Sequence, residues 1–215
     1  MRPASHHPKQ KLLNTVLRYK VLLEPGIAAP EASAEAQTPW HLRRLVERNI
    51  AQLPAPALSL LVCCPRGYVA VTGGAPRYEP GVERLGTRQV QAVASLPWRA
   101  LAARDPRGLV PLAQLIDHLL GSFCAMPEGF LSAGHALSPS WLEVTEALRV
   151  GLSLGYHELP ASEPTPSHYF WWACSLFFTN RRRLGTVDPI AYRLLRSTLF
   201  AEAFWRGHPV EPIAV

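Results

Sequence analysis

Prolines divide this sequence into short segments. The chain contains 21 prolines among 215 residues, which is about double the usual share. A proline lacks an amide hydrogen and has a fixed φ angle, so it favours the first turn of a helix over its interior. The sequence therefore predicts many short elements joined by rigid connections.

Several of these prolines mark the expected starts of helices. Thr38, Asp105 and Asp188 each stand directly before a proline, as an N-cap residue does before the first helical position. Pro166 precedes an aromatic stretch, and residues 140–143 have the Ser-x-x-Glu pattern of a capping box. Apolar residues with helical spacing follow these positions. We therefore expect helices that start near residues 38, 106, 140, 167 and 189.

The segment between residues 57 and 96 has the composition of β-strands. Ala57–Cys64 is rich in Leu and Val, and Tyr68–Thr72 alternates as a strand does. The turn residues Pro65–Gly67 join these two runs into a predicted hairpin, and Gln89–Leu96 predicts a further strand. A small sheet at about 57–96 followed by packed helices gives an α+β fold.

The first 37 residues differ in character from the rest. Lys11–Leu23 predicts one short helix or strand, whereas Pro25–Gln37 is an Ala/Pro/Glu stretch without periodicity. We expect an N-terminal arm at 1–37 that is partly flexible, followed by a single domain at 38–215. With 48% hydrophobic and 18% charged residues, the chain is able to bury a sizeable core.

Composition also indicates where the protein works. The longest apolar runs are far shorter than the roughly 20 residues that cross a bilayer, and the N-terminus lacks the pattern of a secretory signal. The four cysteines lie in apolar surroundings, and the adjacent Cys63 and Cys64 would point to opposite faces of a strand. We therefore expect a cytoplasmic protein with no membrane partner and with buried, reduced thiols. These thiols are Cys63, Cys64, Cys124 and Cys174.

The formal net charge of +6 is compatible with an acidic partner or with nucleic acid. The basic residues are dispersed, and only Arg181–Arg183 forms a run. We interpret this run as the basic end of the preceding aromatic helix, where positive charge stabilises the helix dipole. We expect any binding of nucleic acid to be weak and nonspecific, and a basic nucleic-acid-binding protein is one alternative function.

The second expected helix has a separate face opposite its leucines. Val110, Gln114, Asp117, His118 and Gly121 recur on this face with helical spacing. A zinc peptidase uses such a face for the pattern His-Glu-x-x-His, because two histidines four residues apart reach one zinc ion while the Glu activates the bound water. A third ligand comes from a later helix.

Two stretches of the chain resemble the anthrax-lethal-factor-like zinc metallopeptidases. Residues 112–122, Leu-Ala-Gln-Leu-Ile-Asp-His-Leu-Leu-Gly-Ser, look like the end of that family's active-site helix, where the zinc motif commonly continues into an Asp-His and a Gly. Residues 166–178, Pro-Ser-His-Tyr-Phe-Trp-Trp-Ala-Cys-Ser-Leu-Phe-Phe, are similar to the family's Glu-aromatic-Phe-Ala-Glu helix, whose first Glu is the third zinc ligand. The tail at 183–195 is also similar. The resemblance covers roughly 57–205 and implies a zincin-like fold.

The resemblance places a changed residue at every zinc-chemistry position. Val110 stands where the first ligand His would be, Pro111 where the catalytic Glu would be, and Gln114 where the second His would be. His168 stands where the third ligand Glu would be. The resemblance therefore implies a pseudo-peptidase with no zinc, no other cofactor and no catalytic residues. Pro111 is further expected to truncate or kink the start of its helix.

Loss of catalysis in a retained fold implies a function in binding. The groove of a zincin-like domain, with an edge strand beside the active-site helix, suits an extended peptide. We expect a protein or peptide partner and a regulatory or scaffolding role by analogy. The candidate cleft residues are Asp117, His118, Tyr156 and Tyr169.

A metallopeptidase with a shifted metal site is the other alternative. Such a site would draw on His118, His135, His157 and His168, whose spacing gives it little support. For His118 and its neighbour Asp117, a role in helix packing or at the surface is the simpler interpretation. Elemental analysis of the purified protein separates a lost zinc site from a shifted one.

Overall fold

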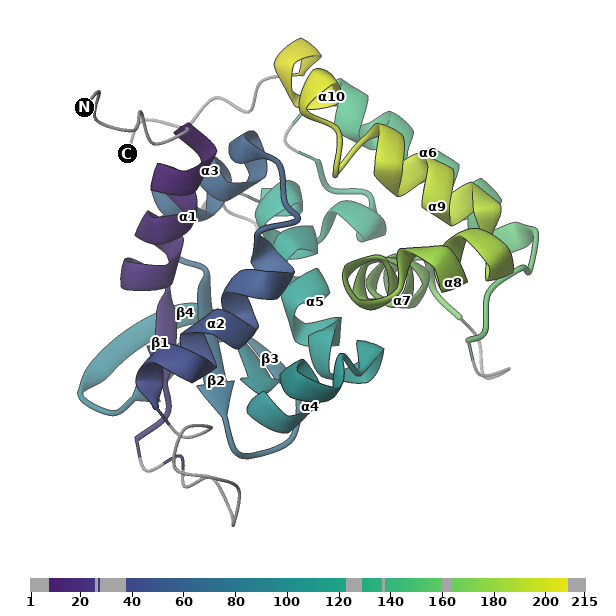
Figure 1. The fold of residues 1–215 in the computed structure, drawn as a ribbon. Helices are drawn as coiled ribbons and strands as arrows, with labels where there is room; N and C mark the ends of the chain where they lie inside the picture. The colour runs from purple at the N-terminus through teal and green to yellow at the C-terminus, as the bar shows by residue number, and fades with distance from the viewer. Residues whose placement is uncertain are drawn as a thin grey trace, which may run out of the picture.

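A computed structural model describes residues 8–25, 27, 38–122, 129–136, 138–159 and 164–208 of the chain. Within these residues the protein combines helices with a small sheet, which confirms the predicted α+β class. Figure 1 shows α5 (Pro106–Ser122) in the middle of the molecule, between the sheet and a group of helices from the second half of the chain. None of the described helices is both long and apolar enough to cross a membrane.

The sheet has four strands in the order β1-β2-β4-β3. β1 (Val21–Leu23) and β4 (Arg88–Pro97) each run parallel to β2 (Tyr68–Thr72), which lies between them. β3 (Arg77–Leu85) is antiparallel to β4 and precedes it, and the two strands are joined by a tight turn in which Gly86 has a φ of 61°. Glycine adopts this left-handed conformation without strain. Because β3 is last in the strand order, it is an antiparallel strand at the edge of the sheet.

One face of the sheet carries most of the core. Alternate residues of β2 and β4 lie in the main cluster of buried hydrophobic side chains. They share this cluster with α5 and with α1 (Pro8–Tyr19), α2 (Pro39–Ile50) and α3 (Ala55–Cys63). On the opposite face, the described residues form only a small buried cluster of Ala70, Val90 and Val93. The helices therefore stabilise the sheet mainly from one side.

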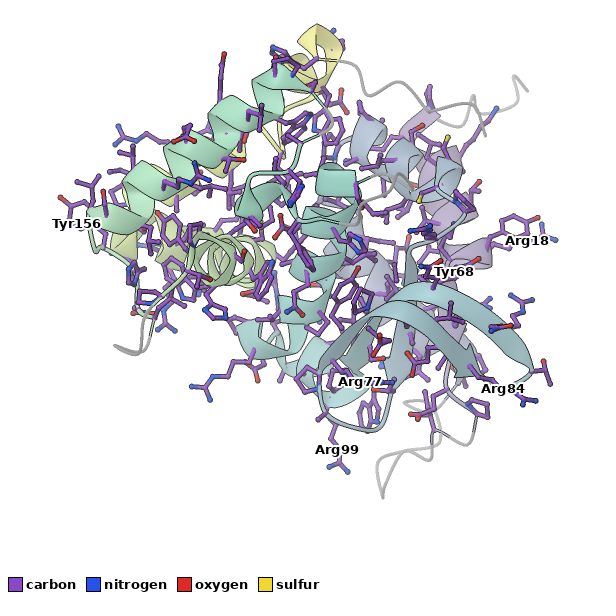
Figure 2. All side chains as sticks on the ribbon, turned by 180° about the vertical axis from the view of Figure 1, so that it is seen from behind. Arg18, Tyr68, Arg77, Arg84, Arg99 and Tyr156 are labelled. Atoms are coloured by element: carbon purple, nitrogen blue, oxygen red, sulfur yellow. The ribbon has the colours of Figure 1, made fainter. Side chains whose placement is uncertain are left out.

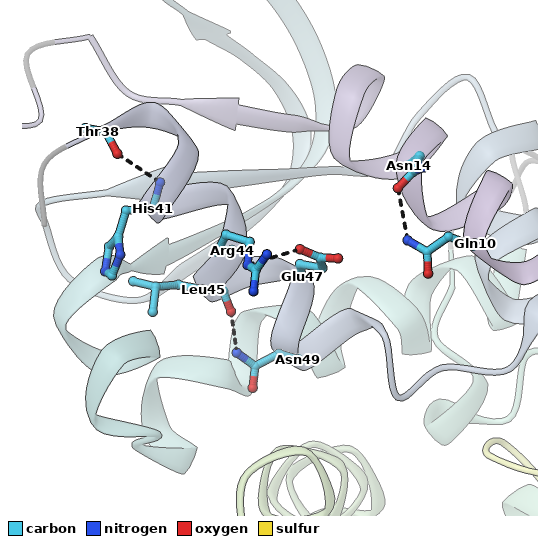
Figure 3. A network of polar contacts seen from close by, with 8 residues as sticks. All are labelled: Gln10, Asn14, Thr38, His41, Arg44, Leu45, Glu47 and Asn49. Carbon is cyan, nitrogen blue, oxygen red and sulfur yellow. Dashed lines mark hydrogen bonds and ion pairs between the residues drawn. The ribbon is translucent and has the colours of Figure 1, made fainter. Parts of the chain in front are cut away.

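α2 begins where the sequence predicts. The side chain of Thr38 accepts a hydrogen bond from the amide of His41 at 3.2 Å, and Pro39 occupies the first turn (Figure 3). Further along the same helix, the side-chain amide of Asn49 donates to the carbonyl of Leu45 at 2.8 Å. The predicted apolar stripe is buried at Leu42, Leu45, Val46, Ile50 and Leu53.

The predicted strand at Ala57–Cys64 is wrong, because these residues belong to the end of α3 and its C-cap. Pro54 is the N-cap of this helix and Pro56 lies in its first turn, which is the position that proline favours. Leu58 and Leu61 are almost fully buried, and their spacing is helical. A short apolar run does not distinguish a strand from a buried helix, and the two prolines were the deciding signal.

The sheet consequently uses residues 21–23 and 68–97 instead of 57–96. β2 pairs with β1 and β4, so the predicted hairpin before β2 is also wrong. β1 and α1 both come from the expected arm at 1–37, and these two elements are part of the folded domain. The predicted strand at Gln89–Leu96 is confirmed within β4.

Lys20 fastens this N-terminal segment to the rest of the fold. Its side chain is 7% exposed, and its ammonium group donates to the carbonyl oxygens of Cys64 and of Arg66, the latter at 3.1 Å. The same group lies 4.6 Å from the centroid of the Tyr68 ring, a favourable cation–π distance. Burial lowers the pKa of Lys20 to about 8. The connection between α1 and β1 is therefore tied to the connection between α3 and β2.

The second half of the chain is helical, as predicted. α6 (Pro139–Ser153), α7 (Pro166–Thr179) and α9 (Pro189–Ser197) start at or next to the expected residues. The capping box at 140–143 is wrong, because Ser138 is the N-cap of α6 and its side chain makes no capping hydrogen bond. Four shorter elements complete this half and the connection before α5. They are α4 (Trp98–Ala103), the 3-10 helix η2 (Leu131–Ala133), α8 (Arg181–Val187) and α10 (Glu202–Gly207).

The cysteines differ from the expectation of four reduced, buried thiols. Cys64 is disulfide-bonded, whereas Cys63 and Cys174 are free. Cys63 is exposed at the end of α3, and Cys174 is buried in α7. Cys124 lies outside the described residues. Disulfides are uncommon in reducing compartments, so the oxidation state of Cys64 bears directly on the predicted cytoplasmic location.

Thiol titration checks this arrangement. A disulfide at Cys64 takes two of the four cysteines, so protein unfolded without reductant should show two thiols and reduced protein should show four. In the native state the exposed Cys63 should react first, and Cys174 should react only after unfolding because it is buried. Finding four thiols in protein purified without reductant would contradict the disulfide and favour the cytoplasmic prediction.

Candidate functional site

A pocket of about 600 Å³ opens between the start of α5 and α7. Apolar and aromatic side chains form much of its wall, and they come from α5, from α7 and from the segment that precedes α7. They are Val110, Leu159, His168, Trp171, Trp172 and Leu176. A concave, largely apolar wall with a few polar groups is the usual form of a ligand site.

The pocket brings together two of the four positions that the zinc-peptidase resemblance singles out. Val110 lies on α5 and His168 lies in the first turn of α7, and both residues line the pocket. Gln114 is half-buried one helical turn after Val110 on the same face of α5. Among the described residues Gln114 and Pro111 lie outside the lining of the pocket.

Pro111 does not truncate α5, so that expectation is wrong. The helix starts at Pro106 and continues through Pro111 to Ser122. Pro111 is the sixth residue of the helix, so its missing amide removes one intrahelical hydrogen bond beyond the four N-terminal amides that have no partner within a helix. Pro111 is also buried, and the apolar contacts of its ring offset part of the cost of the missing amide.

Asp117 connects α5 to two neighbouring elements, η2 and α7. Its carboxylate accepts hydrogen bonds from the amide of Ser132 at 2.8 Å, the hydroxyl of Ser132 at 2.5 Å and the indole nitrogen of Trp171 at 2.7 Å. The side chain is 0% exposed, and a buried carboxylate is tolerated when such donors satisfy it. The hydroxyl groups of Ser132 and Ser167 are 2.8 Å apart, which extends the network to the start of α7.

Burial dominates the electrostatics of this carboxyl group. It raises the pKa of Asp117 to about 6, although the hydrogen bonds from Ser132 and Trp171 act in the opposite direction. The Asp117 charge also contributes to the raised pKa of the fully buried Cys174 thiol, for which burial is the main cause. Asp117 thus connects α5 to η2 and to α7, and its hydrogen-bond partners are Ser132 and Trp171.

His118 points to the sheet side of α5. Its Nδ1 atom is hydrogen-bonded to the hydroxyl of Tyr78 on β3, and its ring lies 5.2 Å from that of Phe130. The residue is 4% exposed. The interpretation of His118 as a helix-packing residue therefore fits the structure.

The other two candidate cleft residues lie apart from each other. Tyr169 is fully buried, and its hydroxyl donates to Asp188 at 2.7 Å. The carboxylate of Asp188 also caps α9 by accepting from the amides of Ile190 and Ala191. Tyr156 follows α6 and is 53% exposed. Asp117, His118, Tyr156 and Tyr169 therefore do not form one cleft, and none of them lines the pocket in the part of the chain that the structure describes.

The structure does not bring the histidines of the proposed shifted metal site into one cluster. His118 contacts Tyr78, His157 lies against Tyr169 and Trp172, and His168 lies against Trp171. Across the described ranges, no group of three or more His, Cys, Asp or Glu side chains is placed to hold a metal ion.

The arginine run has a different role from the one expected. Asn180 ends α7, and Arg181–Arg183 forms the first turn of α8 rather than the basic end of α7. The guanidinium of Arg181 lies 4.4 Å from the centroid of the Phe177 ring. Arg183 pairs with Glu158 at 2.7 Å beside the pocket. Arg181 and Arg183 thus each contact a protein group.

The polar groups of the pocket were missed by reasoning from sequence. Asp105, Arg107, Glu158 and Arg183 line it together with the two indoles, and no pattern in the sequence connects these positions. The adjacent Trp171 and Trp172 were the available signal. Both side chains are only half-buried and line the pocket.

No protein-family model matches this chain, and no curated protein matches it in sequence. Among the described residues, the site has charged groups of both signs at an apolar wall and one imidazole, that of His168. Such a wall is suited to binding a side chain or a short peptide segment.

Proposed function

We propose that this chain is a zincin-like domain that has lost its zinc chemistry and acts by binding a peptide at the pocket between α5 and α7. The observation that carries this proposal is the position of Val110 and His168. The resemblance assigns them to the first and third zinc-ligand positions, and they line one pocket although they come from different helices. This juxtaposition is what the resemblance leads us to expect and supports the proposal.

The arrangement of α5 and the sheet also supports the proposal. α5 packs against β4 and against the antiparallel edge strand β3, as the hydrogen bond between His118 and Tyr78 illustrates. An edge strand beside such a helix provides main-chain groups for an added peptide strand. Pro80 and the irregular pairing between Glu79 and Val82 interrupt β3, so a peptide would pair with only part of this edge.

The side chains that line the pocket could bind a peptide without a metal ion. Val110 and the indole of Trp172 supply apolar contact area, and indoles are frequent anchors at recognition sites. The charged Arg107 and Asp105 beside them provide partners for the polar ends of a peptide. A regulatory or scaffolding role is part of this proposal by analogy with other domains that have kept a binding groove.

Selection from a displayed peptide library tests the proposal. We expect enriched peptides to bind the wild-type protein, and the variants Trp172→Ala and Val110→Lys to weaken that binding about tenfold or more, because they remove or charge the apolar wall. Trp40→Ala is the matched control, since Trp40 is 66% exposed on α2 and lies outside the pocket.

Two outcomes would contradict this function. One is that selection enriches no peptide that binds the folded protein. The other is that the enriched peptides bind the two pocket variants as tightly as they bind Trp40→Ala, while circular dichroism and thermal unfolding show that all three variants are folded.

A further inference from the structure

The outer side of α6 carries exposed apolar residues that the fold does not cover. Leu142, Val150, Leu154 and Tyr156 are 45%, 59%, 48% and 53% exposed, and they make up most of the large exposed hydrophobic residues among those described. Figure 2 shows α6 at the surface of the molecule, with Tyr156 beyond its end. A concentration of exposed apolar side chains on one element is typical of an interaction surface.

Three of these residues lie on one ridge that is inclined to the helix axis. Leu142, Glu146, Val150 and Leu154 follow each other at intervals of four, and the C-cap Leu154 keeps a helical conformation with φ of −79° and ψ of −14°. The opposite side of α6 is buried through Trp141, Val144 and Leu148. Ridges of residues at this spacing interdigitate in the commonest class of helix–helix packing.

We propose that this ridge, Leu142-Glu146-Val150-Leu154, binds the same ridge of a second copy of this chain. The ridge is symmetric about its centre: Leu142 and Leu154 are equidistant from Leu148 along the chain, and so are Glu146 and Val150. Two antiparallel copies related by a two-fold axis at this level bring Leu142 of each copy to Leu154 of the other. Apolar residues then meet at both ends of the contact.

The charges beside the ridge also suit a second copy. Glu146 and Arg149 form an exposed ion pair within one chain, and both lie next to the centre of symmetry. In the antiparallel arrangement each Glu146 faces Arg149 and Val150 of the second copy, so the positive and negative groups are complementary across the axis. A partner with a uniformly charged surface would oppose one of these two groups.

The expected dimer is weak. One helix ridge offers less area than the roughly 1,200 Å² that specific stable interfaces bury, so the two copies should exchange rapidly and assemble only at high concentration. In sedimentation velocity, the weight-average mass of the full chain should rise with concentration toward twice the mass of one chain.

Substitutions on the ridge distinguish this specific contact from nonspecific self-association through exposed apolar residues. Val150→Lys places a charge at the centre and should weaken self-association about tenfold or more. The control Val82→Lys changes an apolar residue of equal exposure, 59%, on β3 and should leave self-association unchanged. Both residues are exposed, so neither change should unfold the protein.

A charge exchange tests the symmetric arrangement itself. Glu146→Arg alone and Arg149→Glu alone should each weaken self-association, because like charges then face each other across the axis. The double variant Glu146→Arg/Arg149→Glu should restore it. A protein that stays monomeric at all concentrations, a dimer insensitive to Val150→Lys, or a double variant no better than the two single variants would each overturn the proposal.

Discussion

Replacing Asp117 by Ala should lower the free energy of unfolding by about 2–3 kcal/mol, as expected when buried donors lose their hydrogen-bond acceptor. The amide and hydroxyl of Ser132 and the indole nitrogen of Trp171 all donate to this carboxylate. Without it, the buried amide of Ser132 loses its acceptor, and the half-buried indole of Trp171 loses the hydrogen bond that connects α7 to α5. Because these donors belong to η2 and α7, the contacts of both elements with α5 should loosen.

Urea unfolding followed by circular dichroism measures this effect. Asp105→Ala is the matched control, because Asp105 is an exposed carboxylate just before the same helix, and we expect a loss of about 1 kcal/mol or less from its exposed side chain. Equal unfolding midpoints for the two variants would show that the Asp117 network contributes little to the fold.

The pH dependence of stability should identify the same group. The fold raises the pKa of Asp117 from 3.8 to about 6, so the folded state binds a proton more tightly than the unfolded state does. The Asp117 contribution therefore increases as the pH falls from about 7 toward about 4, by up to about 3 kcal/mol. The variant Asp117→Asn should lack this increase. A wild-type protein and an Asn variant with parallel pH profiles would contradict the raised pKa.

Gly121→Ala should destabilise the protein by about 2–3 kcal/mol, the usual cost of overpacking a core. A Cβ atom at Gly121 would lie 2.4 Å from the carbonyl oxygen of Gly129 and 2.6 Å from both the amide nitrogen of Leu131 and the carbonyl carbon of Phe130. All three contacts are with backbone, which has no alternative rotamer. The segment before η2 would have to move away from α5.

A glycine without neighbours is the control for this substitution. At Gly207 a Cβ atom would meet nothing within 4 Å, and Gly207 ends α10, so Gly207→Ala should be neutral or stabilise by up to about 1 kcal/mol through the entropy of the unfolded chain. Thermal unfolding of both variants distinguishes them. A melting temperature for Gly121→Ala at or above that of wild type would exclude close packing at this position.

Local signals predicted the helices well because each signal has a direct physical cause. The N-caps Thr38 and Asp188 accept amide hydrogen bonds at the helix starts, and the burial of α5 follows the leucine spacing read from the sequence. The α3 segment was mistaken for a strand because nearly all of its residues are apolar, so that periodicity carried little information. The pairing of distant strands could not be predicted either, because no local sequence pattern indicates that Val21–Leu23 pairs with β2.

The candidate site was predictable only in part. The spacing on α5 and the resemblance in α7 pointed to Val110 and His168, which do share a pocket. The same reasoning placed Asp117 in a cleft, whereas it is fully buried under Ser132 and Trp171. Helical periodicity assigns a residue to a face, but it does not say whether a pocket or another element lies opposite that face.

The central claim, that the pocket between α5 and α7 is a former zinc site, is tested by restoring its ligands. In the variant Val110→His/Gln114→His/His168→Glu, two imidazoles four residues apart on α5 face a carboxylate from α7, which is the ligand set that a zinc ion with one bound water requires. Pro111 stays unchanged because it is buried, and a Glu at this position would bury a charge. The matched control, Val110→His/Gln114→His/His168→Ala, has the same two histidines without the third ligand.

The decisive measurement is the zinc content of each protein, by elemental analysis, after loading with zinc and dialysis against a chelator. The account predicts one equivalent in the restored variant and essentially none in the control or in the wild-type protein. A wild-type protein that retains one equivalent of zinc, or a folded restored variant that retains no more than its control, would contradict it.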